Sequence, residues 1–397
     1  MHLDIHALQP VPYSNLNRDA LGSPKSCVYG GSTRTRVSSQ SWKRAVRFEL
    51  EQQLDEPTVR TRRIPEAVRK ELEHRGWDHD TARRAGRAVL ISADQAATRK
   101  DSKEGGLFPT PDDDQSDVLF WVPRAVITDL ADLAEQYPDA IADMPLPSKQ
   151  EVTKKERPKK QDKPQPVLPV ATVEDILRRR SPSINLLGRM LAEIPGHRVD
   201  GASLFAHAFT THESAMDFDF FTAVDDLNPP DATGSGHLAT AEFTSGVFYR
   251  YSSVNLTDLA TNLSGTDKTQ DGFDDALRVV DAYLRAFCEA VPSGKQRTTG
   301  ATTRPELVYL ALRHDPLSLA GAFEKPVRSH SGSGYAEPSR EQLANYTGRL
   351  HRFLGTDGLL WHGHASIAAE PYEQLGEGYD SLHDLITDST NRAGDAA

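Results

Sequence analysis

The sequence predicts an α+β fold of the ferredoxin-like kind, in which the elements follow the order strand, helix, strand, strand, helix, strand. Four segments have the composition or the alternation of strands, and two segments between them favour helices. Two long stretches fall outside this order. We therefore expect an α+β sheet domain that carries two insertions.

The strand prediction rests on alternation and on side-chain type. In the first segment Leu3, Ile5 and Ala7 would share one face of a strand. Asp4 and His6 would share the other face, so we expect this strand to be half-buried. The third segment is rich in the aromatic and β-branched residues that strands prefer. The four predicted strands are residues 2–8, 203–210, 246–252 and 306–312.

Both helices have a sequence signature. A Ser-Ser-Gln-Ser run at residues 38–41 supplies a hydroxyl cap, and good helix formers follow to about Gln53. The second helix, residues 271–291, repeats apolar residues at helical spacing. Its apolar positions are Phe273, Leu277, Val280, Leu284 and Phe287.

Two insertions interrupt the order. The first, residues 54–202, is mostly helical in pattern, and within it residues 145–169 combine six prolines with many lysines. Such a segment has too few apolar residues to offset its ordering entropy, so we expect a mobile loop there. The second insertion, residues 212–245, is too long for a tight turn. The strongest helical patterns in the first insertion are residues 65–90, 117–136 and 173–194.

The most informative segment surrounds the first helix. The chain has a net charge of −11, yet residues 20–48 contain no acid and six bases. Cations near a helix start oppose the helix dipole, and a polyanion lying across the cap would remove that conflict. Gly30 and Gly31 would let the main chain approach such a ligand. We interpret the segment as a phosphate-binding surface, and the alternative is a solvated basic face. The bases are Lys25, Arg34, Arg36, Lys43, Arg44 and Arg47.

Composition limits the class of protein. With 397 residues, 38% hydrophobic and 26% charged, the chain is long enough to bury a full core. No apolar run approaches the roughly 18 residues of a membrane span, and the first residues do not resemble a signal peptide. The two cysteines, Cys27 and Cys288, lie far apart and lack metal-ligand spacing. We expect a cytoplasmic protein with free thiols and no membrane partner.

Several motifs together resemble one family, the backbone subunit (CasC family) of the type I-E CRISPR surveillance complex, Cascade. The resemblance runs from about Ile5 to about Arg352, and its motifs keep the order of the family. They are the basic segment at residues 29–47 and the short runs at 16–19, 188–190, 221–226, 246–251, 294–297 and 322–325.

The resemblance implies a hand-like protein. An RNA-recognition-like palm would comprise residues 1–55 and 200–325, with a thumb hairpin at 212–245. Helical fingers would comprise residues 56–199, and a C-terminal helical region residues 326–397. The implied partners are the CRISPR guide RNA, further copies of the chain, other Cascade subunits and, through the guide, target DNA. No cofactor is implied, and sequence recognition is left to base pairing.

The site residues carried over from the resemblance fall into two groups. One group would hold the sugar-phosphate backbone of the guide, and the other would displace a base, as apolar wedges do in duplex DNA. The phosphate-binding group is Lys25, Ser38, Gln40, Lys43, Arg44 and Arg47. The base-displacing group is Met190, Thr222 and Leu238. Lys295 and Arg297 would lie on a loop near the backbone groove, although Lys295 could instead serve the end of the preceding helix.

The acids and histidines leave one enzymatic alternative. Asp225 and Asp226 could hold Mg²⁺, as in the related type III backbone subunits, which cut paired RNA with an acidic loop residue. Turn formation or contact with a neighbouring copy explains these acids more simply. Nothing in the spacing of His207, His212 and His237 predicts a metal site. We therefore expect a non-catalytic protein, with a metal-dependent endoribonuclease as the alternative and an RNA-binding module outside CRISPR systems as a third possibility.

Overall fold

The structure is a computed structural model, and it describes residues 1–97, 114–116, 118–146, 165–190, 197–223, 237–265, 270–329 and 334–396. The chain divides into two compact units. The first comprises Met1–Leu54 and Ala202–Ala397, and the second comprises Asp55–Gly201.

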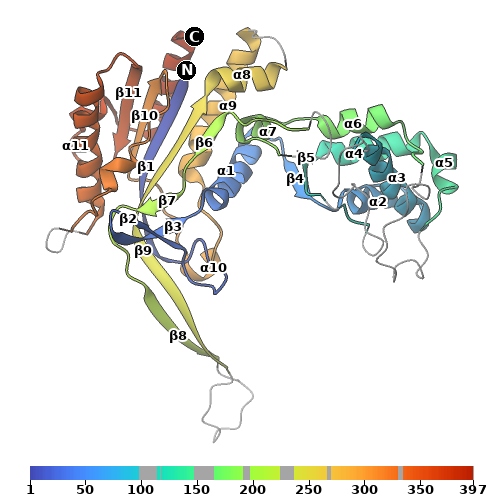
Figure 1. Ribbon diagram of the computed structural model, residues 1–397, viewed down its shortest axis with the longest axis horizontal. Coiled ribbons are helices and arrows are strands. Elements are labelled where there is room, and N and C mark those ends of the chain that lie inside the picture. The colour runs from blue at the N-terminus through green and yellow to red at the C-terminus, as the bar shows by residue number, and fades with distance from the viewer. Residues whose placement is uncertain are drawn as a thin grey trace, which may run out of the picture. The chain divides into compact units, whose positions relative to one another are not determined.

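Four antiparallel strands form the centre of the first unit (Figure 1). They are β1 (His2–Ser14), β7 (Ala208–Thr210), β9 (His237–Asn255) and β10 (Leu307–Arg313), and they lie in the order β10-β1-β9-β7. Helices α1 (Ser39–Leu54) and α9 (Gln270–Glu289) pack against each other. The predicted α+β fold and the predicted order of its elements are confirmed.

The prediction that the first strand is half-buried is wrong. Asp4 and His6 are as fully buried as Leu3 and Ile5 on the opposite face. The reason is that their face is covered as well, by α11 (Ala336–Leu354) and the segment around Phe323. Both faces of β1 therefore belong to the core.

The second and third predicted strands differ in length from the expectation, whereas the fourth, residues 306–312, corresponds to β10 within one residue. The second is broken into β6 (Ser203–Phe205) and β7, which pair separately with β9. The third extends far beyond residues 246–252, because the first part of β9 leaves the sheet and pairs with β8 (Asp217–Ala223). This two-stranded ribbon corresponds to the long excursion that the sequence predicted (Figure 1).

Further strands widen the sheet at both edges. At one edge, β2 (Ser26–Tyr29) and β3 (Ser32–Val37) form a hairpin, and β3 pairs with β7. Gly30 and Gly31 both have positive φ and form its turn. A Cβ atom on Gly30 would lie 1.6 Å from the Glu324 carbonyl oxygen, so the turn and this contact, rather than a ligand, require glycine at residue 30.

The C-terminal region is not helical throughout, which corrects the expectation for residues 326–397. It contains α11 and α12 (Leu382–Asp395), but also β11 (Leu359–Ser366) and β12 (Glu377–Tyr379). These strands extend the sheet beyond β10, because the edge of β10 offers unpaired backbone groups. The remaining elements of the first unit are α8 (Leu256–Ser264), α10 (Gln296–Thr299), η2 (Ala320–Phe323) and η3 (Glu373–Leu375).

The second unit is mostly helical and has its own core. All three strong helical patterns are interrupted. Gly76 and the capping Asp78 separate α2 from α3, a short strand precedes α4, and residues 179–181 separate α6 from α7. Strand β4 (Thr58–Thr61) pairs with β5 (Phe120–Pro123). The helices are α2 (Ile64–His74), α3 (His79–Ala97), α4 (Ala125–Glu135), α5 (Pro138–Ala142), α6 (Val170–Arg178) and α7 (Pro182–Leu187). Most of residues 145–169 lie outside the described part of the chain. Among the described helices, none has the length and apolarity needed to cross a bilayer.

A network of buried polar side chains lies between the sheet and α11. Arg313 contacts His351 Nε2 at 2.7 Å and lies 3.7 Å from Asp4. His6 Nδ1 lies 2.9 Å from the Tyr249 hydroxyl. Burial and the nearby Arg313 lower the pKa of His351 to about 4. The pKa values of three further histidines, His6, His362 and His364, are also lowered, mainly by burial.

Because the pKa values of these histidines are lowered, we expect the free energy of unfolding to decrease as the pH is lowered from about 6.5 to 4. In this window the unfolded chain takes up protons that the folded histidines resist, so acid favours unfolding. Burial raises the pKa of Asp4 to about 6, so uptake of a proton by Asp4 stabilises the fold at low pH. This single carboxyl group opposes the effect of four histidines. Urea unfolding at pH 7 and pH 5 should therefore give a lower free energy of unfolding at pH 5. The variant His351→Gln should reduce this difference in the free energy of unfolding between pH 7 and pH 5. The control variant His383→Gln, at an exposed histidine, should leave the difference unchanged. Equal stability of the parent chain at both pH values would contradict the prediction.

Candidate nucleic-acid interface

Helix α1 is held on the sheet by a buried arginine. The Arg250 guanidinium lies 3.7 Å from the ring centre of Trp42 on α1 and 4.2 Å from that of Phe287 on α9. It donates to Gln9 Oε1 at 2.6 Å and to the Phe287 carbonyl at 2.5 Å. Burial lowers its pKa to about 9, so it remains a cation at neutral pH. The cation between two rings therefore fixes where the first turn of α1 lies.

The start of α1 is capped as the sequence predicted. Ser38 Oγ accepts from the Ser41 amide at 3.3 Å, and the Ser38 amide donates to Asn17 Oδ1 at 2.9 Å. The Lys25 amide donates to the Asn17 carbonyl at 2.9 Å, which ties the loop before β2 to the cap. Lys25, Ser38 and Gln40 are thus brought together, with Ser38 buried and Gln40 exposed. The Ser38 hydroxyl is occupied by the cap, so its exposed neighbours are the better ligands.

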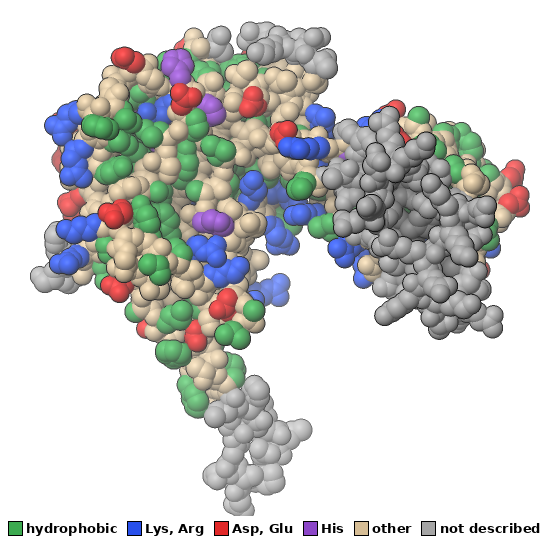
Figure 2. Space-filling view, viewed as in Figure 1, with side chains coloured by type: hydrophobic (Ala, Val, Ile, Leu, Met, Phe, Trp, Pro, Cys, Tyr) green, Lys and Arg blue, Asp and Glu red, His purple; other side chains and the backbone are tan. Residues whose placement is uncertain are grey.

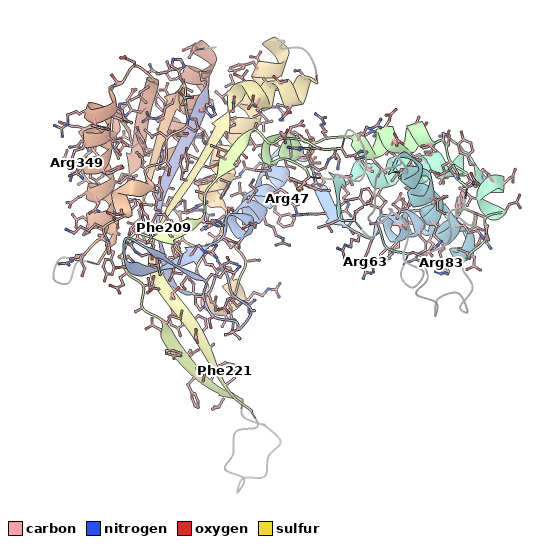
Figure 3. All side chains as sticks on the ribbon, in the orientation of Figure 1. Arg47, Arg63, Arg83, Phe209, Phe221 and Arg349 are labelled. Carbon is pink, nitrogen blue, oxygen red and sulfur yellow. The ribbon has the colours of Figure 1, made fainter. Side chains whose placement is uncertain are left out.

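The three bases on α1 have different surroundings. Arg44 is exposed, and its guanidinium lies 4.7 Å from the centre of the Phe48 ring. Lys43 is half-buried, and burial lowers its pKa. Arg47 is only 9% exposed and pairs with Glu51 at 3.6 Å. Arg44 is therefore the base on α1 most accessible to a ligand. Arg47, on the same helix, is labelled in Figure 3.

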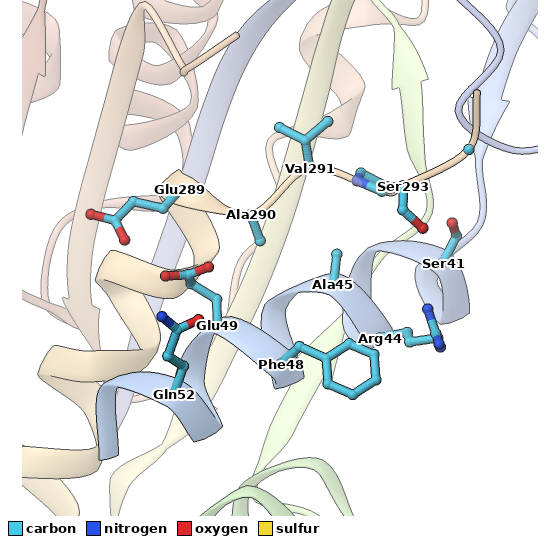
Figure 4. Close-up of a pocket in the computed structure, with 12 residues that line it drawn as sticks. Ser41, Arg44, Ala45, Phe48, Glu49, Gln52, Glu289, Ala290, Val291 and Ser293 are labelled. Carbon is cyan, nitrogen blue, oxygen red and sulfur yellow. The ribbon is translucent and has the colours of Figure 1, made fainter. Parts of the chain in front are cut away.

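A shallow groove of about 290 Å³ runs along α1 and is closed on its other side by residues 289–294 (Figure 4). Arg44, Ser41 and Ser293 lie toward the start of α1. Glu49 and Glu289 lie at the other end. This arrangement accepts an anion near the start of α1 and repels it further along.

The loop that carries Lys295 and Arg297 packs beside this groove. A Cβ atom on Gly294 would lie 2.4 Å from the Leu16 carbonyl oxygen, so glycine is required for the close approach. Lys295 has φ 55° and its ammonium lies 5.6 Å from the centre of the Phe243 ring, at the base of the ribbon. Arg297 follows on the short helix α10. Figure 2 shows Lys and Arg side chains gathered over α1 and α10.

The three base-displacing candidates lie in different places. Met190 belongs to the second unit and is 91% exposed, so it does not pack in the core of that unit. The preceding Arg189 is buried and donates to the carbonyls of Trp121 and His197, so Met190 follows a fixed turn. Thr222 and Leu238 are direct partners in the register of β8 and β9, toward the end of the ribbon. Thr222 is exposed, and the side chain of Leu238 lies outside the described part.

No metal site appears among the residues that the structure describes. Within these ranges no group of three His, Cys, Asp or Glu side chains could hold an ion. His212 is buried, and its Nε2 accepts from the Val247 amide at 3.2 Å. Asp225 and Asp226 lie outside the described residues, so the acidic-loop hypothesis stays a hypothesis.

Sequence reasoning missed His207 beside the cap, named Arg36 only as one of the six bases, and included two bases that are structural. Arg36 and His207 lie next to the first residue of α1, where the His207 Nδ1 accepts from the Ser39 amide at 2.8 Å. No local sequence pattern predicted that His207 lies beside the cap, because this residue is far from α1 in the sequence. Arg34, one of the six bases, is fully buried and donates to the carbonyls of Thr210 and Phe323. Arg47 is likewise held inside the fold by its pair with Glu51.

Comparisons with known proteins agree on one family. A family model described as "CT1975-like protein" matches residues 3–388. A chain of a solved "CRISPR RNA-guided surveillance complex, pre-nicking" is 41% identical, with a TM-score of 0.82, and the match covers 99% of this chain and 100% of that chain. A chain of a second "CRISPR RNA-guided surveillance complex" is 37% identical, with a TM-score of 0.75, covering 98% and 99%. No curated protein matches the chain.

The burial of the bases on α1 predicts different costs for their removal. Arg47→Ala removes a buried ion pair from Glu51 and should lower the free energy of unfolding by about 3 kcal/mol. Arg44→Ala removes an exposed side chain and should change it by no more than about 0.5 kcal/mol. Urea unfolding of both variants beside the parent chain measures the difference. Equal costs would show that the Arg47–Glu51 pair adds nothing to the fold.

Proposed function

Because this chain belongs to the CT1975-like protein family, we propose that it is a non-catalytic backbone subunit of a CRISPR RNA-guided surveillance complex in antiviral defence. We place the complex in type I-E, on the motifs that resemble the CasC family. In this role several copies polymerise along one guide RNA, hold its sugar-phosphate backbone and leave its bases free to pair with target DNA. Other Cascade subunits complete the complex, which acts in the cytoplasm.

The observation that carries this proposal is the surface at the start of α1. Exposed Gln40 and Arg44, half-buried Lys43 and the loop with Lys25 form a strip of cations and polar donors on a chain with a net charge of −11. Such a mixture of bases and neutral donors is typical of proteins that contact phosphates and not base edges. The groove beside α1 supports the same reading, since its two ends differ in charge.

The base-displacing role is proposed for three residues. Met190 supports it through its exposure on a turn held by the buried Arg189. Thr222 and Leu238 support it through their paired position on the ribbon. In the proposed assembly the thumb of one copy reaches over the guide, and a thioether or aliphatic side chain unstacks one base.

Salt dependence tests the contact with phosphates. Affinity for a guide RNA should fall steeply with salt and change little between guides of different sequence. Arg44→Ala should weaken binding to every guide and reduce the slope of log K against log salt by about 0.7, the share of one phosphate contact on a single strand. Fluorescence anisotropy at several salt concentrations measures both quantities. The proposal fails if binding depends on the guide sequence, or if Arg44→Ala leaves affinity and slope unchanged.

A cleavage assay tests the non-catalytic role. Guide-bound protein incubated with complementary RNA and Mg²⁺ should leave that RNA intact. Periodic cleavage products that vanish in Asp226→Ala would support the metal-dependent endoribonuclease instead. Binding of the guide by the same variant serves as the control for its folding.

A further inference from the structure

The break between β6 and β7 turns one histidine toward the start of α1. From Phe205 to Phe209 this strand takes four steps, whereas its partner β9 takes three, from Ser252 to Tyr249. One extra residue in a strand is a β-bulge, and bulges commonly redirect a side chain. The exposed His207 lies in this bulge.

Two donors converge on one nitrogen of His207. Its Nδ1 accepts from the Ser39 amide at 2.8 Å, and Arg36 Nη1 lies 3.4 Å from the same atom. A backbone amide and a guanidinium can only donate, so Nδ1 carries no proton and the ring proton is on Nε2. The pKa of His207 is lowered, by burial first and then by the charges of Arg36 and Lys25, which also favours the neutral ring. The tautomer is therefore set by the fold.

This arrangement leaves one N–H directed away from the helix. Within the described residues, no hydrogen bond engages Nε2 of His207, and the side chain is exposed. The cations Arg36 and Lys25 lie beside it. The amide that opens α1 is already taken by His207, so the donor presented to solvent here is the imidazole and not the helix end.

We propose that His207 is a further guide-binding residue, which donates its Nε2–H to a phosphate oxygen of the RNA held between Arg36 and Lys25. This inference rests on the proposed function. A neutral donor adds affinity and directionality without adding charge. His207 would therefore fix where the phosphate sits, while the two cations attract it.

Two variants distinguish the capping bond that His207 accepts from the Ser39 amide from the proposed contact of His207 with RNA. Asparagine places its amide oxygen near the position of Nδ1, so His207→Asn keeps the acceptor for Ser39 but loses the outward donor. Glutamine places its amide nitrogen near the position of Nε2, so His207→Gln keeps the donor but loses the cap. His383→Asn is the matched control, because His383 is also exposed and also contacts an arginine, Arg285 at 2.8 Å.

Binding of an eight-nucleotide RNA to the full chain, with thermal melting of each variant, gives the test. His207→Asn should bind about tenfold more weakly with an unchanged melting temperature, as expected for loss of one hydrogen bond to a charged group. Its salt slope should stay that of the parent, because no charge is lost, whereas Lys25→Ala and Arg36→Ala should each reduce the slope by about 0.7. His207→Gln should melt earlier and bind within about twofold of the parent, and His383→Asn should match the parent in both respects.

The outcomes are distinguishable. Parent-like affinity in His207→Asn overturns the role of His207 while RNA binding itself stands. A shallower salt slope in His207→Asn also overturns it, because the ring would then act as a cation. A parent chain that binds no RNA removes the proposed function and this inference together. In histidine-selective ¹⁵N spectra, the Nε2 signal of His207 should shift when RNA is added, which a purely structural cap would not cause.

Discussion

The arrangement of the first unit depends on a buried cation, Arg250, that has no carboxylate partner among the described residues. Arg250 lies between the rings of Trp42 and Phe287, so one side chain of β9 contacts both α1 and α9. Its hydrogen bonds go to Gln9 on β1 and to the last turn of α9. A buried charge is costly unless its donors are satisfied in a defined geometry, so the guanidinium permits few alternative positions for α1. The accuracy with which α1 presents Lys43 and Arg44 follows from this contact.

The surface at the start of α1 also depends on where the acids lie. Glu51 neutralises Arg47 inside the fold, and Glu49 with Glu289 marks the far end of the groove. Positive charge is therefore concentrated at the first turns of α1, although the chain as a whole is acidic. Local fields decide contact with an anion, because charges beyond about 10 Å are largely screened at physiological salt. An acidic chain can thus carry a selective phosphate-binding strip and still repel nucleic acid elsewhere.

The parts of the fold that depend on local patterns could be predicted from the sequence. Alternation identified β1, helical spacing identified α9, and the serine run identified the cap of α1. The parts that depend on tertiary contacts could not. Burial of Asp4 and His6 follows from a helix more than 300 residues away in the chain, and the strand β11 pairs only because β10 offers an open edge. The site divides in the same way: Arg44 could be identified from charge alone, whereas the burial of Arg34 and Arg47 and the approach of His207 required the fold.

A single strand links the sheet to the ribbon, and this sets the reach of the ribbon. β9 runs without interruption from His237 to Asn255, pairing first with β8 and then with β1. The change of partner occurs between Phe243, which pairs with Asp217, and Thr244, which pairs with Ser14. Two residues further on, a Cβ atom on Gly246 would lie 2.7 Å from Thr210 and 2.9 Å from the His212 ring. From Thr244, six residues lead to Leu238, a distance of about 20 Å at ~3.3 Å per strand residue. Because the outer part of β9 continues a strand fixed in the core, the position of Leu238 relative to the cap of α1 is set by strand length. In the proposed assembly, a fixed reach of this kind gives the same spacing between displaced bases in every copy.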